Sequence, residues 1–107
     1  MCGILGYIGR PIEKESFEKT LSLLNHRGPD GFGIWRDIDN HLTLGHRRLS
    51  IIDLSVNANQ PIEYHDYILT FNGEIYNYIE LRKELQSKGF KFRTESDSEV
   101  LLAAYME

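Results

Sequence analysis

Apolar residues at helical spacing mark the first predicted helix, over residues 13–25. Phe17, Leu21 and Leu24 fall at i, i+4 and i+7, and Glu and Lys occupy the other positions. This period is typical of an amphipathic helix that covers a core with one face. The following run, residues 26–31, contains two glycines and a proline, so we expect the helix to end there.

Two more helices are predicted from capping signals. Asn77 with Glu80 three residues on has the spacing of a capping box, and Gly89 supplies a C-terminal stop. Ser96 with Glu99 repeats the spacing and opens an apolar helix that we expect to continue to the last residue.

Extended segments account for much of the remaining chain. Alternating or short apolar runs, bounded by turn residues at 37–40 and by a polar loop at 55–60, predict strands or extended segments at 2–9, 32–35, 42–44, 49–54, 67–71 and 90–94. Strands grouped between helices favour an α+β fold with helices packed on an antiparallel or mixed sheet. A simple βαβ alternation fits less well.

Composition narrows the classes of protein. The 107 residues are 41% hydrophobic and 26% charged, which fits one ordinary globular domain. The net charge is −4 and no basic run exceeds Arg47-Arg48, so we expect no nucleic-acid partner. The apolar N-terminus lacks a preceding charged segment, and no apolar stretch approaches the roughly 20 residues of a membrane span. We therefore expect a cytoplasmic protein with no membrane partner.

Cysteine and histidine usage argues against a metal site. The single cysteine excludes an internal disulfide and a multi-cysteine metal site. The four histidines, at 26, 41, 46 and 65, lack metal spacing, and His41 and His46 would lie on opposite faces of a strand. We expect no metal in this chain.

Cys2 is the first candidate for chemistry. Removal of Met1 would leave a thiol and a free α-amine on one residue. An α-amine has a pKa of about 7.7–8.0 and can act as the base for the neighbouring nucleophile. Cys2 taken alone is better explained as a small buried residue at a strand start.

Five motifs in order change this interpretation. They are Cys-Gly-Ile-Leu-Gly at 2–6, His-Arg-Gly-Pro-Asp-Gly at 26–31, Gly-His-Arg-Arg-Leu-Ser-Ile-Ile-Asp at 45–53, Phe-Asn-Gly-Glu-Ile-Tyr-Asn at 71–77 and Ser-Asp-Ser-Glu at 96–99. Together they resemble the class II glutamine amidotransferase domain, most closely that of the asparagine synthetase type.

The resemblance implies a fold. It predicts the N-terminal-nucleophile hydrolase type, with antiparallel sheets packed between helices in an αββα sandwich. Residues 1–107 would be an N-terminal fragment of this domain, so we expect the sandwich to be incomplete here. The ATP-dependent synthetase domain of the family is absent from the sequence.

The resemblance also implies a nucleophile and an oxyanion hole. Cys2 would attack the side-chain amide of glutamine. The Asn72 side chain and the Gly73 backbone N–H would bind the developing negative charge. Without the resemblance, Asn72-Gly73 would be assigned to a plain turn.

The ends of glutamine need partners of opposite charge. The resemblance assigns the α-carboxylate to Arg48, whose planar guanidinium suits it, and the α-ammonium to Asp97, with Glu74 as a second contact. The backbone of Leu49, Ser50, Ile51 and Ile52 would line the substrate. Arg47 would point away, because strand neighbours alternate faces. The alternatives are a solvated arginine pair and, for Asp97, a helix-capping role.

The implied reaction is hydrolysis of glutamine to glutamate and ammonia. In the parent family the ammonia feeds a synthetase domain in cis that amidates aspartate with ATP and Mg²⁺, so no cofactor is expected in this chain. A homodimer is left open. Three alternatives also stay open: another class II amidotransferase, an enzyme of this family with a different carboxylate acceptor, and a non-catalytic glutamine-binding fragment. The loop at 26–30 is assigned no catalytic role.

Overall fold

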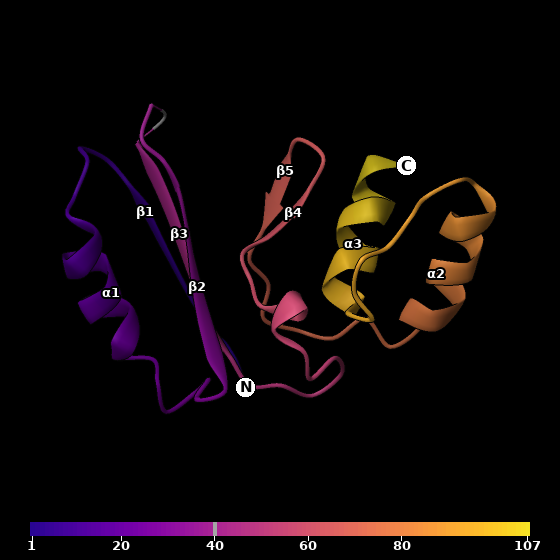
Figure 1. The fold of residues 1–107 in the computed structure, drawn as a ribbon, viewed down its shortest axis with the longest axis horizontal. Helices are drawn as coiled ribbons and strands as arrows, with labels where there is room; N and C mark the ends of the chain where they lie inside the picture. The colour runs from indigo at the N-terminus through magenta and orange to yellow at the C-terminus, as the bar shows by residue number, and fades with distance from the viewer. Residues whose placement is uncertain (40) are drawn as a thin grey trace.

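A three-stranded antiparallel sheet in the order β1-β3-β2 forms one half of the molecule (Figure 1). In this computed structural model, which describes residues 1–39 and 41–107, the strands are β1 (Gly3–Ile8), β2 (Gly31–Asp37) and β3 (Leu42–Arg48). Strand β3 pairs with both neighbours, and its C-terminal end lies beside the starts of β1 and β2. The predicted strands at 32–35 and 42–44 are therefore confirmed but are longer than expected.

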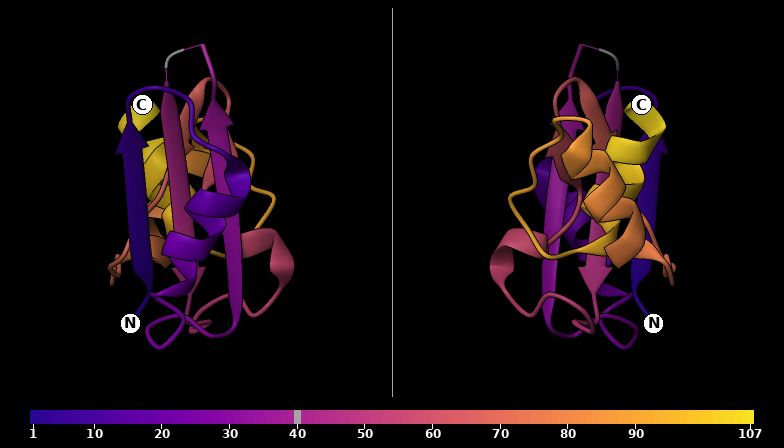
Figure 2. Two further views of the ribbon diagram at one scale, coloured as in Figure 1. Left: turned by 90° about the vertical axis from the view of Figure 1, so that its left-hand side faces the viewer. Right: turned by 90° about the vertical axis from the view of Figure 1, so that its right-hand side faces the viewer.

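Helix α1 (Lys14–Ser22) covers one face of this sheet, as Figure 2 shows from the side of the helix. Phe17 and Leu21 are its buried residues, as the helical spacing predicts. Gly45 allows this packing, because a Cβ there would lie 2.6 Å from Cε1 of Phe17. The sheet thus turns one face to α1 and the other to the rest of the chain.

The second half consists of a hairpin and two helices. The hairpin pairs β4 (Ile62–Tyr64) with β5 (Tyr67–Leu69), and helices α2 (Tyr78–Ser87) and α3 (Asp97–Met106) lie beyond it (Figures 1 and 2). One core joins these elements through the buried residues Ile62, Tyr64, Leu85, Val100, Leu102 and Ala103. A 3₁₀ turn, η1 (Val56–Ala58), lies in the segment between the two halves.

The layers follow the order helix, sheet, hairpin and helices (Figure 1). The α+β class and the antiparallel pairing are confirmed, and the layer order is compatible with part of an amidotransferase domain. Assignment to the N-terminal-nucleophile hydrolase fold stays a prediction. Within the described residues, the helices are all too short or too polar to cross a membrane.

Among the predicted extended segments, the strand at 90–94 is wrong, and the segment at 49–54 does not pair as a strand. Phe90 and Phe92 alternate because both pack against the core of the second half. The N–H groups of Arg93 and Thr94 donate to the Glu99 carboxylate, so they do not pair with a neighbouring strand. Residues 49–54 are irregular because their N–H groups also find side-chain acceptors: Ser50 N–H donates to Asp30, at 2.8 Å.

The helix caps were predicted in part. Ser96 caps α3 and accepts from Ser98 N–H, but Glu99 turns to residues 93–94 instead of completing a capping box. Asn77 occupies the N-cap of α2, but its side chain makes no capping hydrogen bond to the described residues. Gly89 follows α2 with φ +96, the backbone shape expected of a helix stop.

The turn before β3 differs from the prediction at one histidine. His41 has φ 54 and lies in this turn, so the prediction that places it on the strand with His46 is wrong. Asn40, within the predicted turn at 37–40, lies outside the described residues.

Candidate functional site

A small cavity of about 60 Å³ lies where the two halves meet. Its walls come from the residue before β1, the end of β3 and the segment after it, the segment after β5, and the start of α3. Eight predicted site residues line it: Cys2, Arg48, Leu49, Ile51, Ile52, Gly73, Glu74 and Asp97. The structure therefore brings together residues from four separate motifs.

Two predicted site residues do not line this cavity. Ser50 is turned to the loop at 26–31, and its N–H donates to Asp30. Asn72 is half-buried directly beside Gly73 without forming part of the wall.

The Cys2 thiol is held by the backbone of Leu49. Leu49 N–H donates to Cys2 Sγ at 3.3 Å, and Sγ lies 3.6 Å from the Leu49 carbonyl oxygen. The Cys2 carbonyl accepts from Arg27 Nε at 3.0 Å. The backbone of Leu49 therefore fixes the position of the sulfur in the cavity wall. The loop at 26–31 therefore has a structural role next to the nucleophile candidate.

Arg47 and Arg48 face opposite sides of β3. The Arg47 guanidinium lies 5.4 Å from the centre of the Phe32 ring, and its Nε donates to Gly28 O. Arg48 is only 7% exposed, and its Nη1 donates to Ser55 O at 2.6 Å and to Asn59 Oδ1 at 3.1 Å. Arg48 is thus an oriented cation in the wall of the cavity, whereas Arg47 belongs to the other face.

Asp97 joins the start of α3 to the segment after β5. It is 6% exposed, and its Oδ2 accepts from Ile75 N–H at 2.9 Å. A carboxylate at the first turn of a helix is also favoured by the helix dipole. Asp97 therefore lies both in the first turn of α3 and in the wall of the cavity, while the N-cap of the helix is Ser96.

The cavity contains two buried polar side chains that the sequence analysis missed. His46 is fully buried, and its Nε2 lies 3.1 Å from the Phe71 carbonyl oxygen. Burial is the main cause that lowers the pKa of His46, and the nearby Arg48 charge lowers it further. Gln60 accepts from Phe71 N–H and donates to Ser98 Oγ. A signal for His46 was available, because it precedes Arg48 by two residues and so shares its face of the strand.

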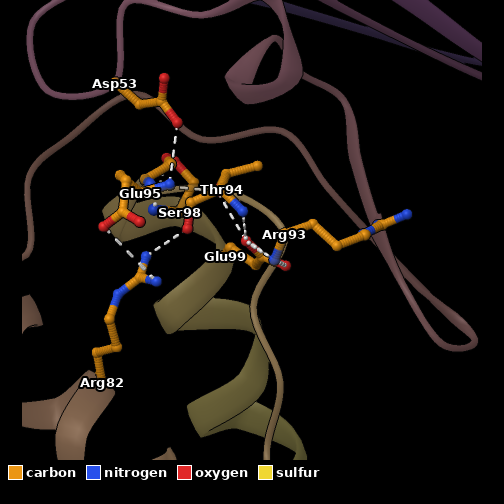
Figure 3. Close-up of polar contacts among 8 residues, drawn as sticks. Asp53, Arg82, Arg93, Thr94, Glu95, Ser98 and Glu99 are labelled. Carbon is orange, nitrogen blue, oxygen red and sulfur yellow. Dashed lines mark hydrogen bonds and ion pairs between the residues drawn. The ribbon is translucent and has the colours of Figure 1, made fainter.

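A polar network supports the wall around Asp97 (Figure 3). Glu99, fully buried, accepts from Arg93 N–H, Thr94 N–H and Thr94 Oγ1. Asp53 Oδ2 accepts from Glu95 N–H at 2.9 Å. Hydrogen bonds from Ser55, and next from the Glu95 N–H, lower the pKa of Asp53. The network fixes the loop that leads into α3.

Other parts of the described chain offer less chemistry. A larger hollow of about 670 Å³ is lined by Lys88, Phe90, Lys91 and Arg93 among others, and it contains none of the predicted site residues. Within the described residues, His, Cys, Asp and Glu side chains do not gather in a group of three that could hold a metal ion.

Comparison with known proteins agrees with the motif order. A family model described as "Glutamine amidotransferase domain" matches residues 1–107. The chain is 48% identical to "Asparagine synthetase [glutamine-hydrolyzing] 1" of Bacillus subtilis, over 98% of this chain and 17% of the relative. It is 43% identical to a protein of the same name from Arabidopsis thaliana, over 100% of this chain and 18% of the relative.

One relative carries a different name. "Amidase chry2" of Gibberella zeae is 39% identical over 98% of this chain and 18% of the relative. The chain thus spans less than a fifth of the length of each of these three relatives.

Proposed function

Because the chain belongs to the glutamine amidotransferase domain family, in its asparagine synthetase type, we propose that it hydrolyses glutamine with Cys2 as the nucleophile. One observation carries the proposal. The Cys2 thiol, the Arg48 guanidinium and the Asp97 carboxylate line the same cavity, although they come from three distant parts of the chain. A nucleophile that shares its cavity with a cation and an anion suits an amino acid with a free α-carboxylate and α-ammonium.

The nucleophile is activated by its own residue. After removal of Met1, the Cys2 α-amine accepts the thiol proton, directly or through a water molecule. The thiolate forms a C–S bond to the amide carbon of glutamine, and the carbonyl π electrons move to oxygen. Leu49 N–H, 3.3 Å from Sγ, holds the sulfur in place for the attack.

The oxyanion is assigned to Asn72 and Gly73. The Asn72 side-chain amide and the Gly73 backbone N–H are the two donors of the proposal, and Gly73 lies in the cavity wall. Loss of one such donor costs roughly 3–4 kcal/mol of barrier in other hydrolases. When the tetrahedral intermediate collapses, the C–N bond breaks and ammonia leaves with the proton held by the amine.

Water completes the cycle. It attacks the glutamyl thioester, glutamate leaves, and the Cys2 thiol is regenerated. Arg48 binds the α-carboxylate, Asp97 with Glu74 binds the α-ammonium, and the backbone of residues 49–52 lies along the substrate. The Nη1 bonds of Arg48 to Ser55 and Asn59 hold its guanidinium in place before substrate arrives, which lowers the cost of binding.

For the full-length protein we propose that the ammonia passes to a synthetase domain in cis, which amidates aspartate with ATP and Mg²⁺ in the cytoplasm. The names of the Bacillus and Arabidopsis relatives support this acceptor. ATP and Mg²⁺ act in that second reaction and take no part in the steps above. The likeness to "Amidase chry2" favours a second candidate, a different acceptor for the same ammonia.

A glutamine-analogue diazo-ketone tests the glutaminase proposal. The protein is incubated with the electrophile, and intact mass and peptide mapping are recorded. We expect loss of Met1 and a single adduct on Cys2, with no adduct in Cys2→Ala. An adduct at another residue, or no adduct on a folded sample that has lost Met1, contradicts the proposal.

A further inference from the structure

Both backbone polar groups of Phe71 are held by buried side chains. Its carbonyl oxygen lies 3.1 Å from His46 Nε2, and its N–H donates to Gln60 Oε1 at 2.5 Å. His46 is 0% exposed and Gln60 is 7% exposed. Both side chains also line the cavity that contains Cys2.

The two side chains reach Phe71 from different elements. His46 belongs to β3, and Gln60 belongs to the segment before β4 and is itself held through its Nε2 by Ser98 Oγ of α3, at 3.0 Å. The Phe71 peptide is therefore fixed between the sheet and the start of α3. Nothing else on the backbone of Phe71 needs a partner, because each residue carries one donor and one acceptor.

A constraint on Phe71 reaches Gly73 through packing. The Phe71 ring lies over Gly73, where an added Cβ would be 2.7 Å from the ring Cζ. The intervening residue is Asn72. Both proposed oxyanion donors thus follow directly after a residue whose backbone and side chain are fixed.

The hydrogen bond also defines the form of His46. A carbonyl oxygen can only accept, so Nε2 carries the hydrogen. Nδ1 is buried and has no hydrogen-bond partner among the described residues. A second proton there would place an unpaired N–H and a positive charge on the same side of β3 as Arg48. The neutral imidazole is therefore the form that donates to Phe71.

We infer that His46 and Gln60 are positioning residues that hold the Phe71 peptide and, through it, keep the Asn72 and Gly73 donors at the oxyanion. The inference rests on the proposed function. Neither side chain is required to touch glutamine. Buried polar groups are costly unless they are hydrogen-bonded, so a merely structural pair would affect stability alone. A positioning pair must also change the chemical step.

The main experiment compares His46→Leu with His46→Gln in the Met1-processed protein. Leucine removes the donor, whereas a glutamine amide can replace Nε2–H toward the Phe71 carbonyl. We expect His46→Leu to lower kcat for glutamine hydrolysis by roughly 10- to 100-fold, the scale of small misplacements of catalytic groups. KM should stay within about threefold, because Arg48 and Asp97 still bind the substrate. His46→Gln should recover most of kcat.

A second pair of variants covers the case in which His46→Leu does not fold. Gln60→Met removes the acceptor for Phe71 N–H, whereas Gln60→Glu keeps a carboxylate oxygen there. We expect the first to be slow and the second to be closer to the parent protein. Circular dichroism melting and the rate of Cys2 alkylation by iodoacetamide are measured on every variant, and alkylation should be unchanged because it needs no oxyanion hole.

A double variant separates positioning from independent effects. If His46 acts through Asn72, His46→Leu should slow an Asn72→Ala protein far less than it slows the parent, since residues that act as a unit are not additive. Additive losses overturn the action of His46 through Asn72. An unchanged kcat in folded His46→Leu and Gln60→Met, or a His46→Gln variant as slow as His46→Leu, overturns the whole inference. Failure of the proposed function looks different, because the parent protein itself would then not hydrolyse glutamine through Cys2.

Discussion

Asp53 and Glu95 are joined across 42 positions of sequence by a hydrogen bond of 2.9 Å from the Glu95 N–H to Asp53 Oδ2. The same carboxylate accepts from Ser55 N–H through Oδ1, at 2.8 Å. This one side chain therefore links the segment after Arg48 to the loop before Asp97. In the proposed site, Arg48 at the start of the first segment binds the carboxylate end of glutamine, and Asp97 at the end of the second binds the ammonium end.

Removal of the Asp53 carboxylate should weaken glutamine binding. In Asp53→Ala, the loops that carry Leu49–Ile52 and Asp97 lose their shared acceptor. We expect KM for glutamine to rise severalfold, about the effect of losing 1 kcal/mol of charged hydrogen bonding. Asp66→Ala, at an exposed residue of the β4–β5 turn, is the control and should leave KM unchanged. Steady-state kinetics on both variants measures the difference, and equal KM values would contradict the link.

The two adjacent arginines offer a matched comparison. Arg48→Lys should raise KM for glutamine by roughly 10-fold or more, because an ammonium cannot replace a planar guanidinium toward a carboxylate. Arg47→Lys should leave KM unchanged and cost at most about 1 kcal/mol of stability through its contact with Phe32. Glutamine kinetics and thermal melting distinguish the two. A similar rise in KM for both variants would contradict the assignment of glutamine binding to Arg48 alone.

Glu99→Gln tests the buried carboxylate beneath the loop that precedes α3. Glu99 is fully buried and accepts three hydrogen bonds from Arg93 and Thr94. A glutamine must turn an N–H₂ group toward one of these donors, so we expect the free energy of unfolding to fall by about 1.5–3 kcal/mol in urea denaturation. Glu95→Gln is the control. Its side chain is 83% exposed and its ion pair with Arg82 is 3.9 Å long, so a change below about 0.5 kcal/mol is expected.

Gly33 marks a close approach between the sheet and the Gln60 backbone. A Cβ at Gly33 would lie 2.2 Å from the Gln60 carbonyl oxygen, whereas one at Gly6 would lie 3.8 Å from Leu44 Cδ2. We expect Gly33→Ala to destabilise the protein by about 1–3 kcal/mol, and more if Gln60 cannot move. Gly6→Ala should be neutral or slightly stabilising, because a strand glycine carries an entropic cost. Equal melting temperatures for the two variants would rule out the backbone contact.

Stability should depend on the protonation of His46. Burial lowers the pKa of His46 from 6.5, so the folded state favours the neutral ring and the unfolded state binds more protons below that value. Stability from this group is present above pH 6.5 and is lost as the pH falls toward the lowered pKa. Arg48 is the charge that faces the ring, and the carboxyl of Asp97 and the thiol of Cys2 line the same cavity.

Urea denaturation of the parent protein and of His46→Gln between pH 5 and 8 measures this dependence. The parent should lose more stability than the variant on acidification below pH 6.5. Parallel curves would show that His46 is not responsible.

The sequence predicted correctly those features that depend on residues only a few positions apart. The period of Phe17 and Leu21 gave the buried face of α1, and Ser96 gave the cap of α3. The alternation of neighbours on a strand was enough to place Arg47 and Arg48 on opposite faces. These predictions depend on residues a few positions apart.

The features that were missed or wrongly predicted depend on hydrogen-bond partners outside the sequence pattern that was used. The pattern at 90–94 alternates like a strand, but Glu99 takes the N–H groups that a neighbouring strand would need. Strand β4, of three residues, was missed, although its partner β5 of the same length was predicted within 67–71. The contacts of His46 and Gln60 with Phe71, 25 and 11 positions away, could not be read from spacing.

The cavity lies between the two halves of the chain, so the site exists only while the two halves are packed against each other. Cys2 is the only thiol in the sequence, and its sulfur is held by Leu49 at the point where the chain leaves the sheet for the second half. Separation of the halves would move Arg48 of β3 away from Asp97 of α3 and open the cavity wall beside Cys2. The labelling rate of this one thiol over time would therefore report whether the two halves are docked.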